Sequence, residues 1–256
     1  KNKNQLVENA KTPILQRART LALQSLEQAI EAADPKRLLY NKLKLKGSTL
    51  EVDGYSFNVN QFKNIYVVGG GKASGIMAEA LEEILGSYIT AGRVNVPYGD
   101  KCKTSIIKII KANHPVPDQA GVEGTLQILA LAGQATEKDL VICLISGGGS
   151  SLMPLPREGI SLEDKRALTD ALLKSGATIS EINTIRKHIS AFKGGWLAKT
   201  AYPATMLNLI LSDVIGDSLD AIASGPAAPD HTTFADAKRI LEKHRLWTNM
   251  PASIRN

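Results

Sequence analysis

The chain contains few cysteines and no long apolar run. Among its 256 residues are only two cysteines, Cys102 and Cys143, so no disulfide framework is indicated and we expect a reducing compartment, the cytoplasm. Cys143 lies inside a short apolar run and is expected to be a buried core residue. No apolar run approaches the length of a membrane-spanning helix, and the N-terminal residues are too polar for a signal peptide.

Aromatic residues are also scarce, at 5% of the chain. The net charge is +6 and the pI is about 9.2, which suits an anionic ligand. Because the Lys and Arg residues are spread along the chain and aromatics are few, nucleic acid is not expected as a partner. His114 and His188 each stand alone, so no zinc-type spacing is present and both are interpreted as structural.

Short apolar strands alternate with helices along the chain. The patterns predict strands over residues 65–68, 93–96, 106–110, 140–145 and 206–211, and helices over 12–33, 73–85, 119–132, 161–174, from 178 onward, and 234–244. Alternation of this kind predicts a Rossmann-like, three-layer α/β/α fold with a mostly parallel sheet. Residues 38–60 contain a hairpin signal at Asp53-Gly54 and are expected to form a small peripheral β element.

The most informative stretch is DLVICLISGGGSS at 139–151. An apolar run ended by glycine is typical of a strand buried on both faces, and glycines allow the backbone to approach a ligand closely. A helix beginning near Ser151 would direct its first N–H groups to the same place. The loop is either a turn that needs small residues or, the interpretation we favour, a phosphate site formed by Ser146, Gly147, Gly148, Gly149 and Ser150.

A second strand–glycine–helix unit contains GGGK at 69–72. It is not a P-loop, because the spacing is wrong and Ala73 follows the lysine, and it is not GxGxxG. The alternatives are a tight turn with a surface lysine, or a ligand site in which Gly70 and Gly71 approach the ligand and Lys72 supplies charge.

Acidic residues follow the last predicted strand. Asp213, Asp217 and Asp220 could hold a divalent metal through carboxylate oxygens, and Asp213 could instead act as a general base. Asp217 and Asp220 are equally well explained as turn or helix-cap residues. Because Lys72, the SGGGSS loop and Asp213 each follow a strand directly, a parallel sheet would bring them to one edge.

The helix that begins at Thr178 carries a capping box with Glu181. Asn183, Arg186 and Lys187 share one side of this helix. An Arg, a Lys and an Asn together would suit a carboxylate or a phosphate, but a solvated helix face is the ordinary alternative.

Five stretches, in this order, together resemble the N-terminal domain of the class II glycerate kinases (glycerate 2-kinases): VVGGGKASGIMAEALEEIL, HPVPDQAG, LISGGGSSLMPLP, EINTIRKHISAFKGGWLA and LILSDVIGDSLDAIASGP. The resemblance implies that residues 1–256 form a Rossmann-like domain whose smaller C-terminal α/β partner lies outside this chain, with the active site in the cleft between them. It implies ATP- and Mg²⁺-dependent phosphorylation of D-glycerate, giving 2-phosphoglycerate.

Carried over residue by residue, the resemblance makes Lys72 the active-site lysine and Asp213 the conserved acid. Asp213 and Asp217 stay the metal candidates that the carboxylate pattern gives. The SGGGSS loop would contact nucleotide phosphates, and Asn183, Arg186 and Lys187 would line the cleft. Two alternatives stay open: an NAD(P)H-dependent hydroxypyruvate reductase, a label that the family also carries, and an isolated domain without activity. No GxGxxG with a following ribose-binding acid supports the reductase. A homodimer is left open as the assembly.

Overall fold

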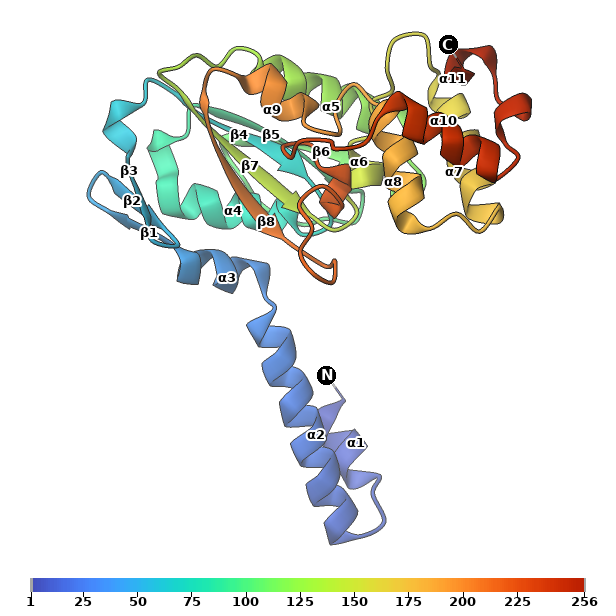
Figure 1. Cartoon of the computed structure of the whole chain (residues 1–256). Helices are drawn as coiled ribbons and strands as arrows, with labels where there is room; N and C mark the ends of the chain where they lie inside the picture. The colour runs from blue at the N-terminus through green and yellow to red at the C-terminus, as the bar shows by residue number, and fades with distance from the viewer. Residues whose placement is uncertain (1, 256) are drawn as a thin grey trace.

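The centre of the molecule is a five-stranded parallel sheet (Figure 1). The computed structural model describes residues 2–255. In spatial order the strands are β6 (Ile107–Ala112), β5 (Ala91–Pro97), β4 (Ile65–Gly70), β7 (Leu140–Ser146) and β8 (Thr205–Leu211). Every neighbouring pair in this sheet is parallel, which confirms the predicted parallel topology.

The two central strands are buried along their whole lengths. Both read as continuous apolar runs because helices cover both faces of the sheet, so neither face can tolerate polar side chains. Cys143 lies in β7 and is fully buried, as expected. Burial raises the pKa of its thiol to about 12, which keeps it an inert, neutral core group.

Helices form a layer on each face of the sheet (Figure 1). On one face α4 (Ser74–Leu85) packs Leu81 against Ile142 and Leu144. On the other face lie α5 (Gln119–Ala132) and α9 (Trp196–Ala201), where Ile128 shares a core with Cys143. The three-layer α/β/α prediction is therefore confirmed. Asp118 caps α5 by accepting a hydrogen bond from Gly121 N, also as expected.

A group of helices beside the sheet has its own hydrophobic core. It consists of α7 (Leu162–Lys174), α8 (Ile179–His188), α10 (Phe234–Lys243) and α11 (Ala252–Arg255). Ile182 and Ile185 of α8 pack with Leu168 of α7 and Leu241 of α10. The helices α7, α8 and α10 were predicted, but α11 and the assembly of all four into a separate core were not.

The N-terminal segment extends away from the body (Figure 1). It begins with α1 (Lys3–Glu8) and α2 (Pro13–Ala32), and α2 contains no buried residue. The apolar side chains of α2 are exposed, Ile14 by 82% and Ile30 by 71%. Then follow α3 (Pro35–Lys42), which was not predicted, and the antiparallel β1 (Leu43–Lys46), β2 (Thr49–Val52) and β3 (Tyr55–Asn58). The expected hairpin at Asp53-Gly54 joins β2 and β3.

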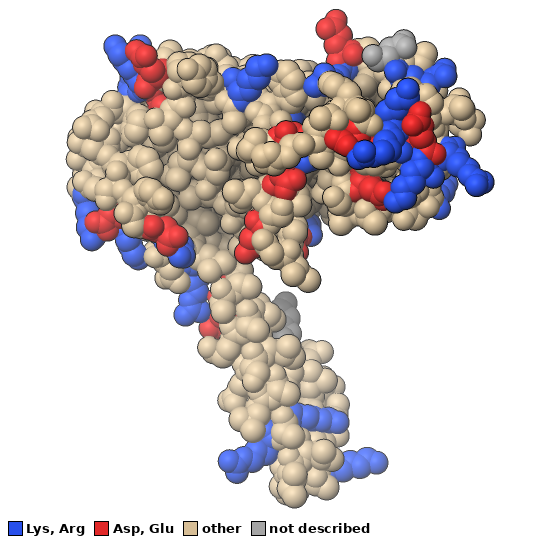
Figure 2. Space-filling view, in the orientation of Figure 1, with Lys and Arg blue, Asp and Glu red and all other residues tan. Residues whose placement is uncertain are grey.

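Charges of both signs gather over the helical end of the molecule (Figure 2). Many of them are paired there: Lys243 lies 2.7 Å from Glu181, and Lys174 lies 2.7 Å from Asp170. The face shown in Figure 2 therefore carries mixed charge over these helices, without a broad surface of one sign. No helix within residues 2–255 is both long enough and apolar enough to cross a membrane.

Glu181 links α8 to α10 and generates a stability prediction. It closes the predicted capping box with Thr178, and hydrogen bonds from Lys243 and from Thr178 N lower its pKa to about 2. Since its pKa falls on folding, its stabilising effect is present above pH 4.5, the ordinary value, and is lost as the pH falls toward 2. We expect Glu181→Gln to lower the free energy of unfolding by about 1 kcal/mol at pH 7 and by less at pH 3.

Urea denaturation at the two pH values measures this difference. The control is Glu163→Gln on α7, whose side chain is 77% exposed. If Glu181→Gln lowers the free energy of unfolding equally at both pH values, the lowered pKa of Glu181 does not contribute to stability.

Candidate active site

The carboxyl ends of three strands meet at one edge of the sheet. Gly70 of β4 pairs with Ile145 of β7, and Ser146 of β7 pairs with Leu211 of β8. The segments that follow these strands therefore start side by side. As predicted, they bring together Lys72, the SGGGSS loop and Asp213.

Lys72 and Asp213 form an ion pair across this edge. Nζ of Lys72 lies 3.7 Å from Oδ2 of Asp213, and the two side chains are 53% and 59% exposed. The backbone N–H of Lys72 donates to Gly147 O at 2.9 Å, which fixes the start of the lysine side chain on the loop. An exposed pair of this kind contributes under about 1 kcal/mol to stability, so both groups are free to exchange their partner for a ligand.

The glycines at 147 and 148 pack closely against side chains of the site. A Cβ on Gly147 would lie 2.1 Å from Oδ2 of Asp213. Gly148 has φ +84°, and a Cβ there would lie 2.9 Å from Nε2 of His114 and 3.0 Å from Cγ of Lys72. The loop backbone thus runs directly against the side chains of the site. This packing accounts for the small residues, and contact with phosphate stays a prediction.

The two glycine turns also touch each other. Gly69 has φ +143°, and a Cβ there would lie 2.0 Å from Leu144 O. A Cβ on Gly71 would lie 2.1 Å from Oγ of Ser146. Gly70 is equally confined, because its Cβ would lie 3.0 Å from Asn95 O. The GGG run of β4 therefore brings its backbone against β7.

Ser146 joins these turns through its side chain. The residue is 2% exposed, and its hydroxyl accepts a hydrogen bond from Ala73 N at 3.0 Å and lies 3.1 Å from Oγ of Ser74. The Ser146 hydroxyl, predicted to contact phosphate, is therefore committed to holding the two loops together.

The helix expected near Ser151 is a single turn. It is α6 (Gly149–Leu152), and the N–H groups of Ser151 and Leu152 both donate to Gly148 O. These bonds come from the third and fourth residues of the turn and do not use the N–H groups of Gly149 and Ser150, so the expected anion site at this helix N-terminus stays a prediction. The hydroxyl of Ser150 instead lies 2.8 Å from that of Ser224.

The polar side of α8 is buried, so it is not a solvated face. Asn183 is 7% exposed and accepts a hydrogen bond from Oγ of Ser224. Lys187 is 3% exposed, and its Nζ lies 3.1 Å from a carboxylate oxygen of Asp220 and 3.1 Å from one of Asp230. Two protein carboxylates thus neutralise Lys187, in place of the substrate anion that was predicted.

The candidate metal ligands do not form a cage. Within residues 2–255 no group of three or more His, Cys, Asp or Glu could hold a metal ion. Asp217 is exposed and adopts φ +50°, the turn conformation of the alternative interpretation. Because Mg²⁺ is commonly held by only one or two carboxylates together with phosphate oxygens, a role for Asp213 or Asp217 stays a prediction.

His114 was interpreted as structural, but it borders the site. It follows β6 and touches Gly148, as the glycine geometry above shows. Its burial and the nearby Lys72 cation lower the pKa of the imidazole, which favours the neutral ring at pH 7. The sequence feature that could have identified His114 as a site residue is its position directly after a strand of the parallel sheet.

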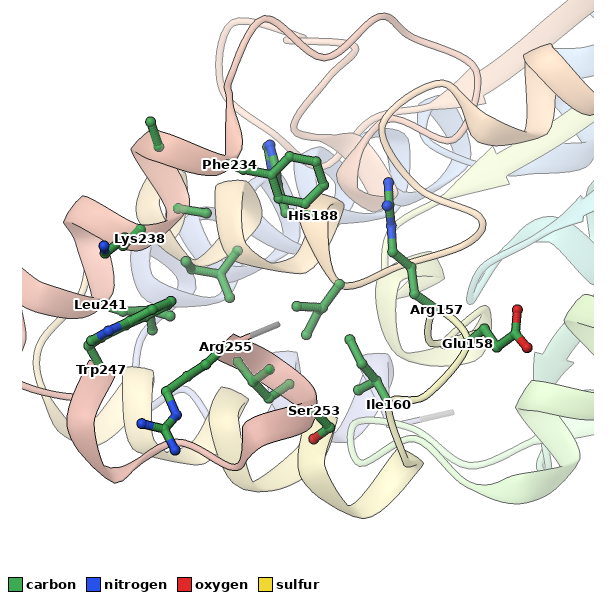
Figure 3. A pocket seen from close by; sticks show the side chains of 15 residues that line it. Arg157, Glu158, Ile160, His188, Phe234, Lys238, Leu241, Trp247, Ser253 and Arg255 are labelled. Atoms are coloured by element: carbon green, nitrogen blue, oxygen red, sulfur yellow. The ribbon is translucent and has the colours of Figure 1, made fainter.

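Among the cavities of the described residues, one is lined by Lys72 itself, and two more lie near this edge and among the helices. One of these two, of about 500 Å³, is lined by Arg186 together with Lys165 and Lys193, which sequence reasoning did not select. Nothing in their spacing indicated that they meet. The other, of about 550 Å³, lies between α8 and α10 and is mainly apolar (Figure 3). It shares no lining residue with the strand edge, and Arg157 beside it lies 5.2 Å from the ring centroid of Phe234.

Replacement of Ser146 tests its bracing role. Ser146→Ala would leave the N–H of Ala73 without its partner in a partly buried setting, so we expect the free energy of unfolding to fall by about 1 kcal/mol. The control is Ser151→Ala in the same loop, since the Ser151 side chain makes no hydrogen bond with any described residue. Chemical denaturation of both variants measures the difference, and equal stability would contradict the assignment.

Comparisons with known proteins place the chain in a family. Residues 21–256 match the family described as a domain of unknown function (DUF4147). The chain is 48% identical to glycerate 2-kinase of Pyrococcus horikoshii over 93% of its own length and 53% of that protein. It is 44% identical to D-glycerate 2-kinase of Thermotoga maritima, over 90% of this chain and 52% of that protein. A protein of Agrobacterium vitis that carries the name hydroxypyruvate reductase is 47% identical, over 70% of this chain and 47% of that protein.

Solved structures agree with this relationship. The crystal structure of a Pyrococcus horikoshii protein superposes with a TM-score of 0.85 at 47% identity, covering 93% of this chain and 53% of that one. The crystal structure of glycerate kinase from Thermotoga maritima superposes with a TM-score of 0.79 at 42% identity, and the match covers 92% of this chain and 53% of that one. The chain therefore spans about half the length of the curated relatives it matches, and it belongs to the class II glycerate kinase family.

Proposed function

We propose that the chain forms part of an ATP- and Mg²⁺-dependent kinase that phosphorylates D-glycerate to 2-phosphoglycerate. The observation that carries this proposal is the exposed Lys72–Asp213 pair, 3.7 Å apart, beside the glycine loop at the ligand-binding edge of a parallel sheet. The names of the relatives supply the substrate. Residues 1–256 would form the Rossmann-like domain, and a smaller C-terminal α/β domain would form the other wall of the cleft. A cytoplasmic location and a homodimer stay predictions.

Phosphoryl transfer depends on positioning and charge neutralisation more than on covalent chemistry. The ammonium group of Lys72 would lie against the transferring phosphoryl group and stabilise its negative charge. Asp213 would orient the attacking hydroxyl of glycerate and accept its proton. Gly147 and Gly148 have no side chain to keep phosphate oxygens away from the loop backbone. Arg186 would contact the glycerate carboxylate.

The residues present fit a magnesium ion that is shared with the nucleotide. The Asp213 carboxylate is exposed, and one carboxylate completed by phosphate oxygens and water is a common Mg²⁺ environment. Asp213 would hold the ion as the alternative to its role as base, with Asp217 as the second candidate for the metal. When bound, Mg²⁺ supplies neutralisation of phosphate charge.

Removal of the Lys72 ammonium tests its role directly. We expect Lys72→Ala to lower kcat about 10²–10³-fold, because a donor to the developing charge is lost. The free energy of unfolding should change by less than about 1 kcal/mol, since the pair with Asp213 is exposed. Lys63→Ala, at an exposed position just before β4, is the control. Turnover near that of the unmodified protein would refute the role.

Gly147→Ala tests the same site through its geometry. Gly147 does not adopt a positive φ, so the backbone accepts alanine, but the new methyl group would occupy the position of the Asp213 carboxylate. We expect kcat to fall at least tenfold, because small misplacements of reacting groups are costly, with little change in Tm. Gly99→Ala is the control, since its Cβ would meet nothing within 4 Å. An unchanged kcat would show that the position of Asp213 does not matter.

Phosphorus NMR tests the function as a whole. The reaction contains ATP, Mg²⁺ and D-glycerate, with this chain or with the chain extended to its natural stop codon. A phosphomonoester signal for the 2-position from either form supports the kinase, and a signal from the short chain shows that this domain suffices. Silence from both, with oxidation of NADH or NADPH when hydroxypyruvate is added, would support the reductase instead.

A further inference from the structure

Three cations surround one cavity beside the glycine loop without a counter-charge. They are Lys165 of α7, Arg186 of α8 and Lys193, which follows α8. Lys165 is 4% exposed and Lys193 is 0% exposed. Among the described residues, no carboxylate oxygen lies within 4.0 Å of any of the three. Asp170 also lines the cavity, but it is paired with Lys174 at 2.7 Å.

The two lysines are held by carbonyl groups alone. Nζ of Lys165 donates to Pro154 O at 2.7 Å, and Nζ of Lys193 donates to Met153 O at 2.8 Å. The Arg186 guanidinium makes no hydrogen bond with any described residue. Carbonyl dipoles orient an ammonium group but do not cancel its charge, so the cluster retains positive charge beside the cavity.

The electrostatic effect of this crowding is visible in the pKa values. Burial, followed by the Arg186 charge, lowers the pKa of Lys165 to about 7. Burial, followed by the charges of Lys165 and Arg186, holds the pKa of Lys193 well below its usual range. Groups perturbed by burial and like charges in a cavity are typical of functional sites. An anion bound in the cavity would offset the repulsion between these positive charges.

The cavity itself indicates the size and character of the anion. Its volume is about 500 Å³, within the range of sites for ligands far larger than a three-carbon acid. One part is lined by the cations and by the hydroxyls of Ser150 and Ser151. The rest is largely apolar, with Pro115, Val116, Pro117, Pro154 and Leu173, and it also includes Arg166, Thr169 and Asp170. Ser150 and Ser151 continue the loop whose Gly148 touches Lys72, so the cavity adjoins the candidate active site.

We infer that this cavity is the nucleotide subsite, with Lys165 and Lys193 holding the polyphosphate and the proline-rich wall contacting the base. The inference rests on the proposed kinase function and specifies where its nucleotide binds. A nucleoside triphosphate carries several negative charges, which match Lys165 and Lys193 together better than the single charge of glycerate does, and Arg186 is left for the glycerate carboxylate. Its flat, weakly polar base matches the apolar wall.

Equilibrium binding without turnover tests the inference. Isothermal titration calorimetry of the full-length protein, in EDTA, would measure Kd for ATP, tripolyphosphate and adenosine. We expect Lys165→Met and Lys193→Met each to weaken ATP and tripolyphosphate binding at least tenfold. Because each variant removes a buried, unbalanced charge while keeping the apolar stem, the Tm without ligand should be unchanged or higher. Lys63→Met is the matched surface control.

The pH dependence provides a second readout. The groups that face Lys165 across the cavity are Arg186 and Lys193, and Arg166 and Asp170 line the cavity from its own helix. Since the protonated amine binds the anion, ATP affinity should fall several-fold between pH 6 and pH 8 as Lys165 loses its proton near pH 7. Lys165→Met should flatten this profile.

The outcomes separate this inference from the proposed function. Unchanged ATP affinity in both lysine variants would overturn the inference even if the protein phosphorylates glycerate. Weakened ATP binding in a protein that transfers no phosphate would support the subsite and reject the kinase. Tripolyphosphate binding as tight as ATP binding would overturn the base contact. If Lys193→Met fails to fold, Lys165→Met decides the result alone.

Discussion

The backbone contact between the β4 and β7 turns is the constraint on which the candidate site depends. Gly69 lies against Leu144, and Ser146 bonds to Ala73, so two strand–turn–helix units are joined at their turns. Parallel strands in register bring the turns to one edge, and the absence of side chains lets them touch. Only with both conditions met can the side chain of Lys72 reach across to that of Asp213. The charges of the site are thus positioned by groups that never meet a ligand.

Two kinds of buried lysine show how the molecule uses charge. Lys187 has two aspartates as partners and acts as a charge-compensated cross-link between α8 and the segments that follow β8. Lys165 and Lys193 have only carbonyl partners. Burial of unbalanced charge opposes folding, so the second arrangement persists at the expense of stability. The contrast within one protein separates a structural cation from one that is available to an external anion.

The sequence was sufficient to predict features that arise from local pattern. The apolar runs of β4 and β7 identified the buried strands, the capping box of Thr178 and Glu181 identified the start of α8, and the rule for strand ends brought Lys72 and Asp213 together. Features that depend on packing between distant segments were not predicted. Lys165 and Lys193 meet only because α7 and the segment after α8 converge on neighbouring carbonyls, those of Pro154 and Met153. The burial of Lys187 depends on aspartates far along the chain. Periodicity indicates which residues share a face, but not what that face contacts.

The helix α2 lies apart from every core of the molecule. Its side chains are exposed along its whole length, and its contacts are mainly with α1. Helices held mainly by their own backbone hydrogen bonds are marginal in water, and regions with few buried contacts open independently of the rest. The arm and the sheet therefore form separate cooperative units: backbone amides in α2 exchange with solvent through local fraying, whereas those of β4 and β7 exchange only when the whole sheet opens. A loss of helical signal on warming would first report on the arm, while the edge that carries Lys72 and Asp213 stays intact.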